Sequence, residues 1–133
     1  MRIIGFNFTK LFIERKEKYK ENLEITNDLS FDDIIKENLP DSKEEILKFY
    51  FTFKTTYKPE VAQIELKGHL ITHPTGEEMK NITKQWKNKE ISNELRIPLL
   101  NYLLEKCSFR ALELEEKLAL PPHIPFPKVK LLR

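Results

Sequence analysis

The sequence predicts an α+β domain in which one four-stranded antiparallel sheet is followed by two to three helices. The strongest observation is a period-two pattern of apolar residues in two adjacent stretches, 47–57 and 62–70, separated by a proline-containing turn. A second observation is the change to helical spacing beyond residue 75. The chain has the length of one domain, 1–133, in which 120–133 form an extended Pro-rich apolar tail.

Composition restricts the class of protein. With 40% hydrophobic and 33% charged residues the chain is globular, and no apolar run approaches the roughly 18 to 20 residues of a membrane span. A single cysteine excludes an internal disulfide, and Met1 begins directly in a strand pattern, so we expect a soluble, cytoplasmic protein. The net charge of +2 is too balanced to identify a nucleic-acid binder, and three glycines leave little for a phosphate-binding loop.

The first part of the chain is expected to form a hairpin and then a short helix. The apolar alternation changes parity near Thr9, which indicates a β-bulge. A solvated, lysine-rich turn at residues 15–20 leads to a second, shorter strand at 22–27. Ser30 is placed to cap a helix over residues 31–38, because acidic residues follow it in the first turn.

Residues 44–72 are expected to form one long hairpin that organises the fold. In the expected register Leu47 faces Leu70 and Phe49 faces Gly68, which puts the apolar residues of both strands on one face. An aromatic ring opposite a strand glycine can cover the space that the missing side chain leaves. The predicted core comes from this hairpin and from the later helices: Leu47, Phe49, Phe51, Phe53, Ile64, Leu66, Leu70, Leu99 and Leu103.

Three helical segments are expected after the hairpin. Thr75 and Glu78 have the spacing of a capping box at the start of the first. Ser92 is placed to begin the second, and Ser108 to cap the third. The four prolines between residues 121 and 127 then force an extended conformation, and the apolar residues around them indicate that this segment packs on something.

The residue types that carry chemistry show no catalytic pattern. His69 and His73 are on a predicted strand, where four residues separate them by about 13 Å, too far to share a metal. Cys107 lies in a leucine-rich segment and is interpreted as a buried structural thiol. The carboxylates of residues 113–117 are adjacent to a lysine and form no isolated acid–base pair. We therefore expect no enzymatic activity, no metal and no cofactor.

Aromatic residues are in surplus on the predicted sheet. The helices would cover most of them as ordinary core, but so small a domain is expected to leave some exposed in a groove or a subunit interface. The aromatic and aliphatic side chains that are least expected to be buried in the core are expected to line a groove that binds polypeptide: Trp86, Tyr57, Ile124 and Phe126.

The order of elements, two hairpins followed by helices and a Pro-containing apolar segment, resembles the SecB-type chaperones that keep unfolded export clients soluble. The resemblance covers Gly5 to about Pro127 and rests on GFNFTKLFIER, ENLEITN, EILKFYFTFKTTYK, VAQIELKGHLI, RIPLLNYLLEKC and LALPPHIPF. The composition would suit an archaeal member of such a family. The departures are a single glycine in the fourth strand where the family often has a pair, the extra helix at 31–38, and no acidic tail for a translocase.

The resemblance implies an ATP-independent holdase that binds unfolded or newly made polypeptides in apolar grooves. It also implies a homo-oligomer, dimer or tetramer, with possible contacts to a translocase or a ribosome and no insertion into a membrane. The oligomer interface would be formed by helix residues: Leu95, Leu99, Tyr102 and Leu103.

An alternative is an RNA- or ribosome-associated binding module that uses the polar face of the sheet. In this alternative Tyr50 stacks on bases, while Lys48, Lys54 and Lys67 meet phosphates. Glu65 and Thr52 lie on the same predicted face, which is why this alternative ranks second.

Overall fold

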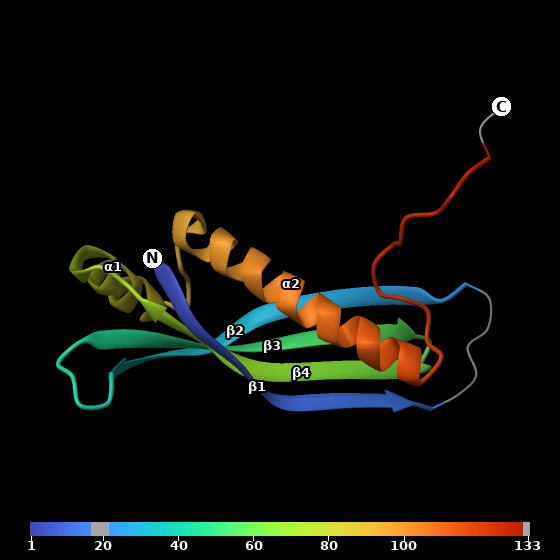
Figure 1. Ribbon diagram of the computed structural model, residues 1–133, viewed down its shortest axis with the longest axis horizontal. Helices are drawn as coiled ribbons and strands as arrows, with labels where there is room; N and C mark the ends of the chain where they lie inside the picture. Colours follow the sequence, from blue (N-terminus) through green and yellow to red (C-terminus); the bar gives the residue numbers. More distant parts are fainter. Residues whose placement is uncertain (17–21, 132–133) are drawn as a thin grey trace.

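The computed structural model describes residues 1–16 and 22–131 and confirms the α+β architecture (Figure 1). The four strands are β1 (Arg2–Arg15), β2 (Glu24–Asn38), β3 (Glu45–Lys58) and β4 (Ala62–His73). They form one antiparallel sheet in the order β1-β4-β3-β2. Two helices follow, α1 (Gly76–Trp86) and α2 (Asn93–Lys117). α2 lies along one face of the sheet, so the sheet has a helix-covered face and an open face (Figure 1).

The central hairpin of β3 and β4 forms as predicted, but its register differs by two residues. Leu47 pairs with Thr72 instead of Leu70, because the loop after Lys58 is longer than a tight two-residue turn. A shift of two residues keeps the same side chains on the same face of a pleated strand. The predicted core is therefore confirmed, and each of its nine residues is at most 3% exposed.

The β4 residue Gly68 lies directly against the backbone of β1. It pairs with Phe8, next to the register shift between Phe8 and Lys10 that confirms the bulge expected near Thr9. A Cβ atom on Gly68 would collide with the carbonyl oxygen of Asn7. The aromatic ring across the strand pair belongs to Phe51, not to Phe49 as predicted, as a consequence of the changed register.

Replacing Gly68 by alanine is expected to lower the free energy of unfolding by about 2 to 3 kcal/mol, since the backbone of β1 must move to admit the methyl group. Urea denaturation measures the loss. The matched control is Gly76→Ala at the start of α1, where no atom lies within 4 Å of the added carbon. Equal stabilities of the two variants would show that the contact at Asn7 is not tight.

The helix predicted over residues 31–38 is wrong, because β2 continues as a strand to Asn38. A register shift between Phe31 and Asp33 inserts one extra residue into the strand. Phe31 and Ile34 therefore both pack against the core at a spacing of three, which resembles helical periodicity in the sequence. Pairing of β2 with β3 along its whole length outweighs the local helix-start signal.

The two helices differ from the three that were expected. α2 is unbroken, so Ser108 lies inside a helix and does not cap a new one. Five of its six buried residues follow one ridge at intervals of four residues: Leu99, Leu103, Cys107, Ala111 and Glu115. The sixth buried residue is Ser108. The capping box of α1 is confirmed by a bond from the Glu78 backbone N–H to Thr75 Oγ1 and one from the Thr75 N–H to Glu78 Oε1.

Two further sequence predictions concern the lysine-rich turn and a membrane-spanning segment. The lysine-rich turn expected at residues 15–20 falls largely on residues 17–21, which lie outside the described residues. Over the residues that the structure describes, neither helix combines the length and the apolar character needed to cross a membrane.

Candidate functional site

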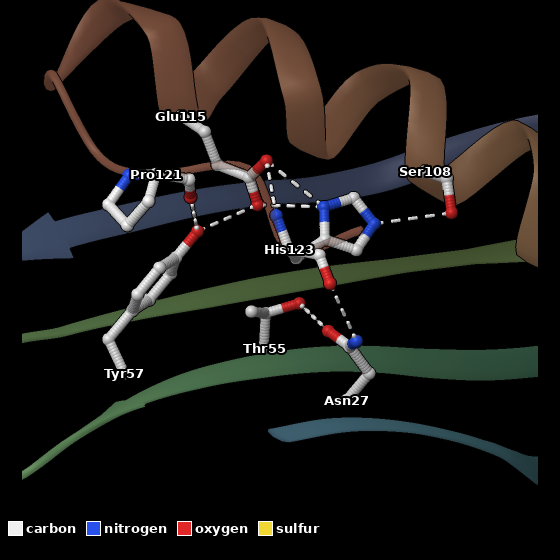
Figure 2. Close-up of polar contacts among 7 residues, drawn as sticks. All are labelled: Asn27, Thr55, Tyr57, Ser108, Glu115, Pro121 and His123. Carbon is white, nitrogen blue, oxygen red and sulfur yellow. Dashed lines mark hydrogen bonds and ion pairs between the residues drawn. The ribbon is translucent and has the colours of Figure 1, made fainter. Parts of the chain in front are cut away.

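A buried polar cluster joins the C-terminal end of α2 to the segment that follows it (Figure 2). Glu115 is 1% exposed, and its Oε1 accepts a hydrogen bond of 3.2 Å from the backbone N–H of His123. The other carboxylate oxygen lies 2.8 Å from Nδ1 of the His123 ring. The hydroxyl of Tyr57 lies 2.9 Å from the same oxygen. We call Tyr57, Ser108, Glu115 and His123 the Glu115 cluster.

Tyr57 is held in its protonated form by this environment. Burial raises the pKa of Tyr57 above its ordinary value, and the adjacent Glu115 carboxylate raises it further. The hydroxyl therefore serves as a donor, with Glu115 Oε2 and the carbonyl oxygen of Pro121 (2.6 Å) as its acceptors. A buried tyrosine at this position joins β3 to both α2 and the following segment.

Ser108, His123 and Glu115 are arranged in space like the three residues of a hydrolytic triad. One nitrogen of the His123 ring, Nε2, lies 3.3 Å from Ser108 Oγ, and the other, Nδ1, lies 2.8 Å from the Glu115 carboxylate. A nucleophile also needs substrate access and donors for an oxyanion. Ser108 is buried and lies within a helix, where backbone N–H groups bond to the preceding turn. The geometry therefore favours a structural role for the serine.

What the cluster does is fasten the chain after α2 to the sheet. The carbonyl oxygen of His123 accepts a bond from Asn27 Nδ2, and Asn27 Oδ1 accepts one from Thr55 Oγ1 (Figure 2). On the other side, Arg15 Nη1 donates to the carbonyl oxygen of Leu118 at 2.7 Å. These contacts tie residues 118–123 to β1, β2 and β3.

An apolar groove lies between β2 and the helices, and we call it the Trp86 groove. It has a volume of about 220 Å³, and Phe31, Trp86 and Leu100 are among its lining residues. Trp86 is half-buried, and its Nε1–H donates to Asp33 Oδ1 at 3.3 Å. Lys89 places its ammonium group 4.8 Å from the centre of the Trp86 ring. The indole is thus oriented by polar contacts and leaves part of its surface open.

A second groove, the Phe126 groove, borders the far end of α2. It has a volume of about 430 Å³, and Leu112, Leu120 and Phe126 are among its lining residues. Leu100 and Leu112, one from each groove, are twelve residues apart on α2, a distance of roughly 18 Å along the helix axis. The exposed Leu104 lies between them at a spacing of four from Leu100. Leu100, Leu104 and Leu112 thus lie on one row of α2 at multiples of four residues, with the buried Ser108 between Leu104 and Leu112.

The four side chains expected to line one groove are not brought together. Trp86 and Phe126 lie in separate grooves, while Ile124 is exposed beside the fastened segment. Tyr57 is fully buried, so the prediction that its side chain lies outside the core is wrong. Its position on the apolar face of β3 was visible in the sequence, and Glu115 supplies the acceptor that makes its burial favourable.

The residues expected at an oligomer interface also need correction. Leu99 and Leu103 pack in the core of their own chain, because they lie on the buried ridge of α2. Leu95 and Tyr102 are half-buried, and the Tyr102 ring meets Phe6 edge-on. The large apolar side chains that α2 exposes are different ones: Ile97, Leu104 and Phe109.

Sequence reasoning missed the Glu115 cluster altogether. Glu115 was grouped with exposed neighbouring carboxylates, although it continues the four-residue spacing of Cys107 and Ala111 on the buried ridge. That spacing is the one feature of the sequence that indicates a buried Glu115. No feature of the sequence indicates the partners of His123, because they depend on the path of the chain after the helix.

The cysteine and the two other histidines considered as candidate reactive or metal-binding groups contact neighbouring side chains of the fold. Cys107 is buried as predicted, and burial raises the pKa of its thiol to about 12. His69 lies beside Tyr50, with ring centres 5.6 Å apart, while His73 is 3.7 Å from Glu44. Among the described residues, no group of His, Cys, Asp and Glu has the arrangement of a metal site.

The open face of the sheet carries charges of both signs. Lys10, Lys54 and Lys67 surround Glu65 at 3.0, 3.9 and 3.8 Å. The hydrogen bond from Lys10 lowers the pKa of the Glu65 carboxyl, and the charges of the surrounding lysines lower it further. Lys48 is similarly paired, with Glu37 at 3.1 Å. The lysines of the RNA alternative thus face carboxylates, which weakens their attraction for phosphate.

Comparison with known proteins gives a relationship at the level of fold. No family model and no curated protein matches the sequence. Among solved structures, the chain is similar to the Mycobacterium tuberculosis SecB-like chaperone Rv1957, in a complex with a ChAD peptide from the antitoxin HigA1. The TM-score is 0.50 at 16% identity, over 99% of this chain and 92% of that chain. With four antiparallel strands followed by two helices in the same arrangement, this chain has a SecB-like fold.

Proposed function

We propose that this protein is an ATP-independent holdase that binds unfolded or newly made polypeptides along α2. The observation that carries the proposal is the Trp86 groove, an open apolar groove between β2 and the helices. The SecB-like fold supports it, as does the peptide bound to the structural neighbour. Holding needs no nucleotide, because a higher affinity for the unfolded than for the folded client is sufficient.

The dimensions of the proposed surface suit an extended client segment. The distance of roughly 18 Å between Leu100 and Leu112 corresponds to about five or six residues of extended chain. Leu104 lies on the path between them and would contact an apolar side chain of the client. The affinity of one such segment is expected to be modest, and several grooves on one oligomer would increase it.

The charges at the two grooves differ and would orient a client. Lys89 and Arg96 line the Trp86 groove together with a single carboxylate, Glu90. Glu113 and Glu116 line the Phe126 groove. A client segment with an acidic residue near the first groove and a basic residue near the second would complement both.

Several parts of the proposal go beyond the fold. Self-association as a dimer or tetramer stays a prediction, and it cannot use Leu99 and Leu103, which are buried in the core of their own chain. Contacts with a translocase or a ribosome, and a cytoplasmic location, stay predictions.

The single tryptophan provides a direct test, because Trp86 lines the proposed groove. Titration with a model protein in its unfolded form is expected to shift the fluorescence of Trp86 to shorter wavelength, whereas the folded form of that protein should leave it unchanged.

A second experiment measures the affinity for the unfolded protein by size-exclusion chromatography. Leu104→Ala is expected to weaken the complex with the unfolded protein about tenfold, a loss of about 1.4 kcal/mol. The control is Phe12→Ala on the open face.

Two outcomes would contradict the proposal. One is an unchanged emission together with no complex on the column. The other is binding of RNA, with an affinity that falls steeply with salt, in the absence of any binding of unfolded protein, which would support the alternative.

A further inference from the structure

The outer edge of β2 is open. The strand order places β2 at one end of the sheet and β1 at the other, and within the described residues no strand pairs with either outer edge. β2 is fifteen residues long. An edge of this length presents unpaired backbone N–H and C=O groups to which another extended segment can bond.

The two edges differ in charge. β2 carries five carboxylates and one basic residue: Glu24, Asp28, Asp32, Asp33, Glu37 and Lys36. β1 has the opposite balance, with three basic residues and one acidic residue. Asp28 lies opposite Lys54 and makes no ion pair within the part of the chain that is described. A basic strand would therefore prefer the edge of β2.

The segment 128–131 has the sequence of such a strand. Lys128 and Lys130 alternate with Val129 and Leu131, the period of two that places like residues on one face. Val129 and Leu131 are 103% and 97% exposed. The prolines end at Pro127, so every residue from 128 onward has a backbone N–H to donate.

The path of the chain directs this strand away from its own sheet. The Glu115 cluster fixes His123 next to Asn27 of β2. The last part of the described chain extends outward and leaves the body of the molecule (Figure 1). Pro125 and Pro127 favour an extended, stiff connection that keeps residues 128–131 at a distance. The segment is thus presented to a partner and not to its own β2.

We propose that residues 128–131 of one copy pair as an added strand with the outer edge of β2 of a second copy. The lysines of the segment would face the carboxylates of β2, and Val129 and Leu131 would become covered. Two copies can exchange their segments around a two-fold axis, which closes the assembly. This contact does not depend on the proposed holdase activity.

The first test is sedimentation of the full chain at micromolar concentration with paired charge reversals. Wild type is expected to be a dimer or larger, and Lys128→Glu combined with Lys130→Glu should weaken self-association at least about tenfold. Adding Glu24→Lys and Asp28→Lys to that variant should restore it. The control reverses two exposed lysines at the C-terminal end of α1, with Lys84→Glu in the helix and Lys87→Glu at its C-cap, and should leave the mass unchanged.

The second test shows whether residues 128–131 contact β2 of another copy or β2 of their own chain. Copies with Lys130→Cys are mixed under mild oxidation with longer, tagged copies that carry Thr26→Cys or Ser30→Cys, which lie on the same face of β2 as Glu24 and Asp28. Buried Cys107 should not compete. A disulfide between the two lengths of chain is the expected result. A monomer in sedimentation, an unchanged mass after both lysine reversals, or the absence of a disulfide between the two lengths of chain would overturn the proposal.

Discussion

Replacing Glu115 by alanine is expected to lower the free energy of unfolding by roughly 3 to 5 kcal/mol. The change removes an acceptor for the Tyr57 hydroxyl and for the backbone N–H of His123, and it leaves the His123 ring without its carboxylate. These groups are buried, so water does not replace the lost partner without rearrangement. Urea denaturation followed by circular dichroism measures the loss.

Glu113→Ala is the matched control for this prediction. Glu113 is exposed and pairs only with Arg110 at 3.0 Å, so its removal is expected to change stability by less than about 1 kcal/mol. Limited proteolysis gives a second measurement, because loss of the cluster should expose residues 118–123 to cleavage in Glu115→Ala but not in the wild type. A stability loss no larger than that of the control would show that the cluster does not fasten this segment.

Replacing Phe51 by alanine is expected to cost roughly 3 to 5 kcal/mol of unfolding free energy. The Phe51 ring has no exposed surface, stacks on Phe6 with ring centres 5.7 Å apart and covers the space above Gly68. Its truncation leaves a cavity in the middle of the sheet that neighbouring residues of β1 and β4 can fill only in part. Urea denaturation again measures the effect.

Phe109→Ala provides the control, because it makes the same truncation at a ring that is 60% exposed. This variant is expected to lose less than about 1 kcal/mol. Similar losses for the two phenylalanines would mean that the face of β3 and β4 beneath α2 is not the core of the protein.

The sequence predicted the parts of the fold in which local and long-range preferences agree. The alternation in β3 and β4 placed Phe49, Phe51 and Phe53 in the core whichever register formed, because a shift of two residues changes no face. The capping box of Thr75 and Glu78 is a local signal and was recovered. The bulge in β2, in contrast, gave Phe31 and Ile34 a helical spacing that only pairing with β3 resolves.

Less of the candidate site could be predicted, because its groups meet only in the folded chain. The sequence predicts Trp86 in a groove shared with Tyr57, Ile124 and Phe126, whereas Trp86 lines a groove between β2 and the helices without these three. The Tyr57–Glu115 contact joins residues 58 apart in sequence, and nothing in the run around Glu115 distinguishes a buried carboxylate from its exposed neighbours except the ridge spacing. Tyr57 was therefore assigned to a surface that it does not reach.

The most direct measurement of the holdase proposal is the aggregation of a denatured model protein, followed by light scattering with and without a stoichiometric amount of this protein. The proposal predicts that wild type suppresses the scattering without nucleotide, that Trp86→Ala and Phe126→Ala suppress it less, and that Phe12→Ala suppresses it as well as wild type. Variants that act like wild type would mean that the grooves have been misplaced. Scattering that is unchanged by wild type at every ratio would contradict the proposed function.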